Sequence, residues 1–217
     1  MIIEADDKGH RHGNFPNYYS FHPPQNRLLL LEQYGLMTHI RRGLFGPQGD
    51  KATAATSSRR KKPRLEISRE CNEIYYCDLG CNEGDLTMAV SSCLSNKEVH
   101  NNEQIVRCLG LDLDPTLIQR ATDKFSGKDG NDDSENVFKA CNLCSDYEHN
   151  NACSSFFASN NTQLDPTPKE MFSLTTIFST TMWVHIHGGD DGLKKFIERA
   201  CGWTKQFLLI EPQRSGW

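Results

Sequence analysis

From Glu73 onward, short continuous apolar runs alternate with segments of helical periodicity. The apolar runs predict five strands, at residues 73–80, 103–114, 136–141, 173–180 and 206–211. Helices are expected between them, at residues 83–94, 115–125 and 190–201. Strands that are apolar throughout are typical of a parallel sheet covered by helices on both faces. The pattern therefore predicts an α/β fold with a doubly wound, mostly parallel sheet.

Other parts of the chain do not follow this alternation. Residues 126–136 and 144–170 are rich in Asn, Asp and Ser, so we expect loops or insertions there, with at most a short helix in the second segment. Before the alternating region, residues 27–36 predict a helix whose leucines pack on the sheet. Neither loop segment is assigned any chemistry.

A chain of 217 residues is long enough for one sizeable core, but its charge is unevenly distributed. Residues 1–70 carry 12 Lys and Arg against 7 Asp and Glu, whereas residues 71–217 carry 12 against 21. The strongest basic run, residues 59–64, lies among polar and small residues, which favours a solvated linker over a nuclear signal or an RNA contact. We therefore divide the chain into an N-terminal lid over substrate and cofactor (1–43), a disordered basic insertion (44–70) and a core (71–217).

The composition also indicates whether the chain crosses a membrane, forms disulfides or binds a metal. No window approaches 18 consecutive apolar residues, and the N-terminus lacks the features of a leader peptide, so we expect a soluble protein with no membrane partner. Nine cysteines without an export signal predict reduced thiols rather than disulfides. The pairs Cys77/Cys81 and Cys141/Cys144 lack His partners at zinc-finger spacing, so no metal site is predicted.

The turn after the first predicted strand has the composition of a ligand-binding loop. Gly80 and Gly84 flank it, and Asn82 stands in the middle, where a dinucleotide loop has a glycine that lets the pyrophosphate approach. This favours a nucleoside ligand without phosphates at that point and disfavours a nicotinamide-dependent oxidoreductase. Asp112 ends the second strand, where a carboxylate can accept hydrogen bonds from both ribose hydroxyls, and Asp114 is expected to cap the next helix.

Five segments together carry a resemblance to a known family. They are GNFPNYYSFHPPQNRLLLL (13–31), DLGCNEGDLT (78–87), LDLDPTLIQRA (111–121), TTMWVHIHGGDDGL (180–193) and LLIEPQ (208–213). In this order they resemble the bicoid-interacting protein family of RNA 5′-phosphate O-methyltransferases. The resemblance implies a Rossmann-like class I methyltransferase fold and S-adenosylmethionine as cofactor. Because the family continues beyond the last of these segments, the C-terminal strands are expected to be missing here.

The family has two branches, and the sequence of residues 13–24 resembles one of them more closely than the other. The resemblance implies that the chain methylates the 5′-monophosphate of small RNAs such as histidine tRNA and microRNA precursors. The alternatives are a γ-phosphate methyl-capping enzyme of a nuclear small RNA and a catalytically inactive RNA 5′-end binding protein. We expect a monomer in the cytoplasm, with a nuclear location as the alternative.

The resemblance also implies site residues. Arg27 matches the arginine that meets the carboxylate of the cofactor, a role that suits a bidentate guanidinium. The expected cofactor contacts are Arg27, Asp78, Gly80, Asn82, Asp112, Asn142 and Leu143. The family usually has an acid at the position of Asn142. Residues 181–193 are expected to form a loop that lines the reaction site.

A terminal phosphate is already anionic, so the nucleophile requires alignment rather than a general base. Neutral donors suit this task because strong neutralisation would weaken the nucleophile. The candidate catalytic residues are Tyr18, Tyr19, His185 and Glu211, and the candidate substrate contacts are Asn14, His22, Trp183 and Gln213. Trp183 is equally compatible with stacking on a terminal base and with core packing. Each histidine alone is also compatible with a surface or structural role.

Overall fold

The computed structural model describes residues 18–45, 73–95, 105–125, 136–159 and 169–212. Asn14, Gln213 and the basic run at residues 59–64 lie outside these ranges. Within them, no helix combines the length and the apolar character that crossing a bilayer requires. The cysteines of the described ranges are all free thiols.

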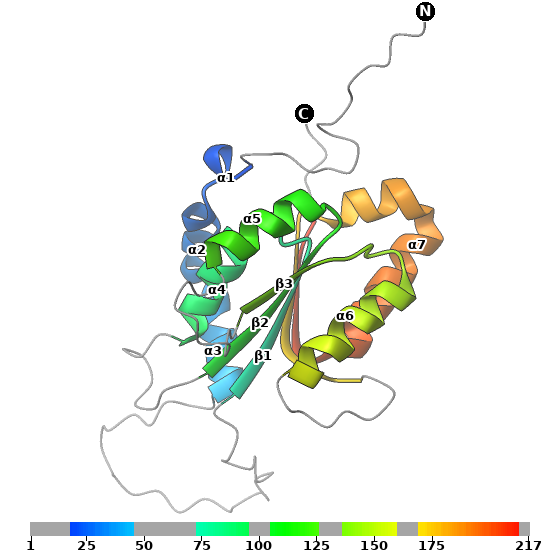
Figure 1. The fold of residues 1–217 in the computed structure, drawn as a ribbon. Helices are drawn as coiled ribbons and strands as arrows, with labels where there is room; N and C mark the ends of the chain where they lie inside the picture. The colour runs from blue at the N-terminus through cyan, green and yellow to red at the C-terminus, as the bar shows by residue number, and fades with distance from the viewer. Residues whose placement is uncertain (1–17, 46–72, 96–104, 126–135, 160–168, 213–217) are drawn as a thin grey trace, which may run out of the picture.

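The centre of the molecule is a parallel sheet, and its strands fall where the apolar runs predict them (Figure 1). The strands of the described ranges are β1 (Glu73–Leu79), β2 (Ile105–Asp112), β3 (Asn136–Ala140), β4 (Phe172–Phe178) and β5 (Thr204–Glu211). They pair in the order β3-β2-β1-β4-β5, and every pair is parallel. The predicted fold class, an α/β fold with a doubly wound parallel sheet, is confirmed.

The strand order reverses between β1 and β4. Strands β2 and β3 lie on one side of β1, in that order, and β4 and β5 lie on its other side. The connections therefore diverge at the carboxyl ends of β1 and β4. In open α/β sheets this is where ligands bind.

Helices cover both faces of the three central strands, which explains why β1, β2 and β4 are buried along most of their length. On one face, Cys77 and Leu79 pack with α6 (Asp146–Ser159) and α7 (Thr181–Trp203). On the other face, Ile74 and Tyr76 pack with α3 (Leu36–Phe45) and α4 (Asp85–Ser95). Helix α5 (Pro115–Phe125), predicted with these bounds, packs beside α4 on β3 (Figure 1).

The N-terminal region forms three helices rather than the single one predicted. They are α1 (Tyr18–Phe21), α2 (Pro24–Gln33) and α3, with a turn at Gly35 between the last two. Leu28 and Leu31 pack against the core, but Leu29 and Leu30 are 66% and 51% exposed. The prediction that all these leucines pack on the sheet is therefore wrong, because consecutive residues of a helix cannot all share one buried face.

Helix α6 corrects the loop predicted for residues 144–170. It spans Asp146–Ser159 and buries His149, Ala152, Cys153, Phe156 and Phe157. Their spacing of three, four, seven and eight residues is that of one helix face. The high Asn and Ser content concealed this periodicity, and the packing of the two phenylalanines against Phe172 outweighs the weak helix propensity.

Helix α7 corrects the loop predicted for residues 181–193. The chain enters the helix at Thr181, and Gly189, with φ 63° and ψ −168°, marks a kink between two helical segments. Residues 190–203 form the second helical segment, where a helix was predicted at residues 190–201. The first segment was missed because its aromatic, β-branched and glycine residues are poor helix formers, whereas the burial of Val184 holds it on the sheet.

Replacing Phe156 tests whether α6 contributes to the core. Phe156→Ala removes a ring that is 1% exposed and contacts Tyr75, Phe157 and Phe172, so we expect the free energy of unfolding to fall by about 3–5 kcal/mol. Tyr147→Ala on the same helix is the control, because that ring is 80% exposed and its loss should change the value by less than about 0.5 kcal/mol. Urea unfolding measures both. Similar, small losses in the two variants would contradict the assignment of α6 to the core.

Candidate functional site

Arg27 is the cationic centre of the carboxyl edge of the sheet. It lies in the first turns of α2, and its side chain is 17% exposed. Its Nη2 group donates to the Tyr18 hydroxyl at 2.8 Å and to Ser179 Oγ at 2.7 Å, and its Nε lies 3.1 Å from Glu211 Oε2. The guanidinium therefore joins α1 to the ends of β4 and β5.

These contacts leave part of the guanidinium unused. An arginine side chain has five N–H donors, and those of Nε and Nη2 are engaged. The Nη1 group has no hydrogen-bond partner among the described residues. Arg27 also lies near the rings of Tyr18 and Phe178, at 5.6 and 6.0 Å from their centroids. A partly buried guanidinium with one free NH2 group can bind a carboxylate.

Tyr19 provides a neutral hydroxyl at the same edge. Its OH donates to the Cys81 carbonyl at 3.4 Å, which joins α1 to the turn after β1. Burial raises the phenol pKa well above its usual value, and the nearby Asp78 carboxylate raises it further. The hydroxyl therefore stays protonated at neutral pH, as the predicted role of a neutral donor requires.

The turn after β1 has the geometry expected of a ligand-binding loop. Gly80 and Asn82 both have left-handed backbones, with φ of 91° and 52°. A Cβ on Gly80 would lie 1.9 Å from Thr180 Oγ1, so only glycine lets β1 and the end of β4 approach this closely. The Asn82 backbone N–H donates to Asp112 Oδ2 at 2.9 Å, which brings together two of the residues that were expected to contact the cofactor.

Asp112 is oriented by the backbone around it. Its Oδ1 accepts from the Asp114 N–H at 3.0 Å and its Oδ2 from Asn82, so each oxygen retains a lone pair for a ligand. Burial raises the pKa of this carboxyl, while the same two backbone N–H groups oppose the rise. Asp114 accepts from the Thr116 N–H at 2.7 Å and caps α5, as predicted.

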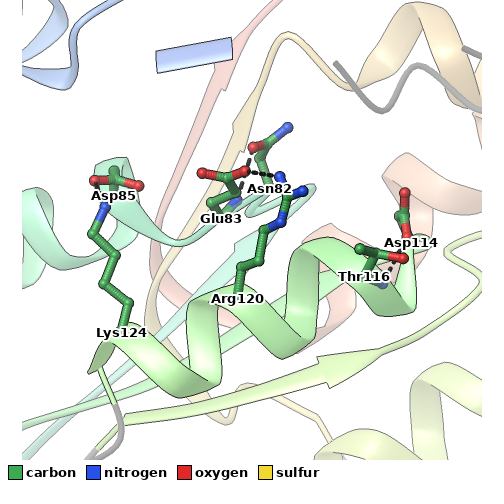
Figure 2. A network of polar contacts seen from close by, with 7 residues as sticks. All are labelled: Asn82, Glu83, Asp85, Asp114, Thr116, Arg120 and Lys124. Carbon is green, nitrogen blue, oxygen red and sulfur yellow. Dashed lines mark hydrogen bonds and ion pairs between the residues drawn. The ribbon is translucent and has the colours of Figure 1, made fainter. Parts of the chain in front are cut away.

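Two ion pairs fasten this loop to α5 (Figure 2). Arg120 Nη1 donates to Glu83 Oε1 at 2.7 Å, and Lys124 pairs with Asp85. Asn82 Oδ1 accepts from the Glu83 N–H at 2.8 Å, so the side-chain oxygen of Asn82 is engaged within its own turn. The Glu83 and Arg120 pairing was not predicted, because it joins the turn after β1 to α5, which only the fold brings together.

Asp78 lies directly beneath the turn and is 2% exposed. Its carboxylate accepts hydrogen bonds from Thr87 Oγ1 at 2.5 Å and from Thr176 Oγ1 at 2.7 Å. Tyr76 OH lies 2.9 Å from Thr176 Oγ1 and extends this network. Asp78 therefore braces β1 against α4 and β4, and a direct contact with the cofactor stays a prediction.

Asn142 and Leu143 occupy the turn after β3. The side-chain oxygen of Asn142 accepts from the Cys144 N–H at 3.0 Å, and its backbone N–H donates to Glu148 Oε2 at 2.8 Å. Leu143 is buried, and its carbonyl accepts from Arg199 Nη1 at 2.8 Å. Glu148 and Arg199 were not predicted, since α6 was expected to be a loop and α7 supplies Arg199 from far along the chain.

The remaining predicted residues of the described ranges are less closely tied to Arg27. His185 is exposed, and its Nε2 lies 2.6 Å from Asp190 Oδ1 across the kink of α7. His22 is exposed, with its ring 4.9 Å from that of Tyr18. Trp183 is half-buried on the first turn of α7, and its carbonyl lies 2.8 Å from His187 Nδ1. Their roles toward a substrate stay predictions.

Sequence reasoning missed Ser179, Thr87 and Thr176, which hold Arg27 and Asp78. Serine and threonine are common residues without a distinctive spacing here, so nothing in the sequence marks them. In the described part of the chain, no three His, Cys, Asp or Glu side chains gather in a way that could hold a metal ion.

Comparison with known proteins adds to this geometry. A family model described as Bicoid-interacting protein 3 (Bin3) matches residues 172–216. Over 217 residues the chain is 30% identical to a pre-miRNA 5′-monophosphate methyltransferase of Xenopus laevis, and the match covers 98% of this chain and 70% of that relative. The chain belongs to the bicoid-interacting protein 3 family.

Other relatives in this family are similarly distant. A pre-miRNA 5′-monophosphate methyltransferase of Danio rerio is 30% identical over 206 residues, which cover 93% of this chain and 66% of the relative. The human RNA 5′-monophosphate methyltransferase is 29% identical over 205 residues, which cover 93% and 57%. The family member described here thus spans between 57% and 70% of the length of these relatives.

Among solved structures, a TehB-like SAM-dependent methyltransferase from Corynebacterium glutamicum matches with a TM-score of 0.39 and 17% identity, covering 86% of this chain and 68% of that one. The methyltransferase CalH in complex with SAH matches with a TM-score of 0.40 and 12% identity, covering 64% and 32%.

The buried carboxyl of Asp78 leads us to expect that the stability of the protein depends on pH. Burial raises its pKa to about 6, against the hydrogen bonds from the two threonines. The folded state therefore holds this proton more tightly than the unfolded state, whose carboxyl titrates near 4. As pH rises from about 4 to 6, the contribution of Asp78 to stability should fall by on the order of 3 kcal/mol.

Asp78→Asn removes this titration. The stability of the wild type relative to the variant should decline between about pH 4 and pH 6 and stay level above that range. Chemical denaturation at several pH values measures the difference. A difference that is independent of pH would show that the pKa of Asp78 is not raised.

Proposed function

We propose that this chain is an S-adenosylmethionine-dependent methyltransferase that methylates the 5′-monophosphate of a small RNA. The observation that carries the proposal is the convergence of the Arg27 guanidinium and the Asp112 carboxylate on one edge of the sheet. This edge belongs to a chain that is 30% identical over 217 residues to a pre-miRNA 5′-monophosphate methyltransferase. Family membership and site geometry thus support the same activity.

The residues at the edge fit an adenosyl amino acid. Asp112 retains acceptor capacity for ribose hydroxyls, and the Nη1 group of Arg27 is free to meet a carboxylate. Leu143, in the turn after β3, is the apolar residue that we assign to the adenine ring. The cofactor would supply a methyl group that is activated by its positively charged sulfur.

The protein's own contribution is alignment and charge placement. The 5′-monophosphate carries about −1.5 to −2 charges near neutral pH, so its oxygen is a nucleophile without a general base. Tyr18 accepts from Arg27 through its hydroxyl oxygen, so its own O–H remains available to orient a phosphate without neutralising it. Tyr19 stays neutral and donates its O–H to the Cys81 carbonyl. Glu211 is paired with Arg27, which limits the net positive charge near the reacting oxygen.

Small RNAs with a 5′-monophosphate, such as microRNA precursors and histidine tRNA, are the substrates we propose. A transfer assay with a radiolabelled methyl group, run on otherwise identical RNAs with one or three 5′-phosphates, tests this. We expect label on the monophosphate and little on the triphosphate. Preference for the triphosphate would favour a γ-phosphate capping enzyme, and cofactor binding without any labelled RNA would favour an inactive RNA 5′-end binding protein.

The role of Asp112 gives a further prediction. Asp112→Ala removes a charged acceptor, so the KM for S-adenosylmethionine should rise by roughly tenfold to a hundredfold, as expected for the loss of about 1.5–3 kcal/mol. Asp114→Ala is the matched control: it removes the cap of α5, lowers stability by about 1 kcal/mol and leaves this KM nearly unchanged. Equal KM values in the Asp112 variant and the wild type would exclude the assigned ribose contact.

A further inference from the structure

Ser179 is held in a backbone conformation that serine does not favour. It is the first residue after β4, and its φ is 54°, in the left-handed region. A residue with a Cβ is strained there, and glycine is the residue that adopts this conformation readily. Backbone strain of this kind at a ligand-binding edge points to a requirement for the side chain.

The hydrogen bonds of Ser179 indicate what its side chain does. Its backbone N–H donates to the Glu211 carbonyl at 2.9 Å, which ties the end of β4 to the end of β5. Its Oγ accepts from Arg27 Nη2 at 2.7 Å. Glycine would preserve the first hydrogen bond but not the second.

The second hydrogen bond determines how the guanidinium is turned. Tyr18 OH and Ser179 Oγ together take both donors of Nη2, and Glu211 takes Nε. Three fixed partners around a planar group leave Nη1 as the part that faces a ligand. Without the serine hydroxyl, Nη2 has a free donor and the plane can rotate.

We propose that Ser179 is a positioning residue that orients Arg27 toward the carboxylate of the cofactor, and that its strained backbone is retained for this purpose. The inference rests on the proposed function, in which Arg27 binds that carboxylate. It predicts that Ser179 matters only for ligands that carry the carboxylate.

Calorimetry with two ligands tests this on the full chain. S-adenosylhomocysteine carries the carboxylate, and 5′-methylthioadenosine lacks the whole amino-acid part. For both Ser179→Ala and Ser179→Gly, the Kd for S-adenosylhomocysteine should rise about fivefold to tenfold, because the lost hydrogen bond acts on the ligand only indirectly, through the orientation of Arg27. The Kd for 5′-methylthioadenosine should stay within about twofold of the wild type. In the methyl-transfer assay, the KM for S-adenosylmethionine should rise while kcat changes little.

Glu170 provides a matched control. It is an exposed residue that precedes β4 at the opposite end, it has φ 53°, and its N–H donates to the Gly202 carbonyl at 2.9 Å. At both positions the glycine variant should melt roughly 2–4 °C above the alanine variant, because glycine relieves the same strain. Only the Ser179 variants should lose affinity for S-adenosylhomocysteine.

The possible results are distinguishable. If the Ser179 variants bind S-adenosylhomocysteine like the wild type, or lose both ligands equally, Ser179 does not act through the carboxylate and the inference is overturned. If glycine and alanine at position 179 melt alike, the claim of strain is wrong. If the wild type binds neither ligand, the proposed function itself fails.

Discussion

The close approach of β1 to both of its neighbours determines the geometry of the site. β1 pairs in parallel with β2 on one side and with β4 on the other, so three strand ends meet at one edge. Gly80 permits this, because a side chain there would collide with Thr180 at the end of β4. The Asn82 N–H then reaches Asp112 at the end of β2. A wider turn at this point would separate the residues that we assign to the cofactor.

The charges at this edge are arranged in a way that suits an anionic nucleophile. Arg27 is the cation that links the N-terminal helices to the sheet, and Glu211 is paired with it. Asp78 and Asp112 have raised pKa values because they are buried, and Tyr19 remains protonated. The edge thus offers one oriented guanidinium with neutral hydroxyls beside it. This arrangement favours the binding of a carboxylate and leaves the charge of a phosphate largely intact.

The N-terminal helices and the last two strands depend on each other through the same contacts. Arg27 comes from α2, Ser179 follows β4, and Glu211 ends β5. These three residues are separated by more than 150 positions at the extremes, and only the folded sheet brings them together. The cofactor binding that we propose at Arg27 would therefore be sensitive to the packing of α2 on α4. This connects the stability of the N-terminal helices to function.

Local patterns in the sequence predict the strands, the doubly wound class, the glycine turn, and the places of Asn82 in that turn and Asp112 at a strand end. These patterns are runs of apolar residues, glycine spacing, and acids at strand ends. The helical state of residues 146–159 and 181–188 depends on the tertiary structure, because burial of Phe156, Phe157 and Val184 outweighs poor helix propensity. It also decided the roles of Ser179, Thr87 and Thr176. Their hydroxyls gain a function only from partners distant in sequence, and no local pattern records such partners.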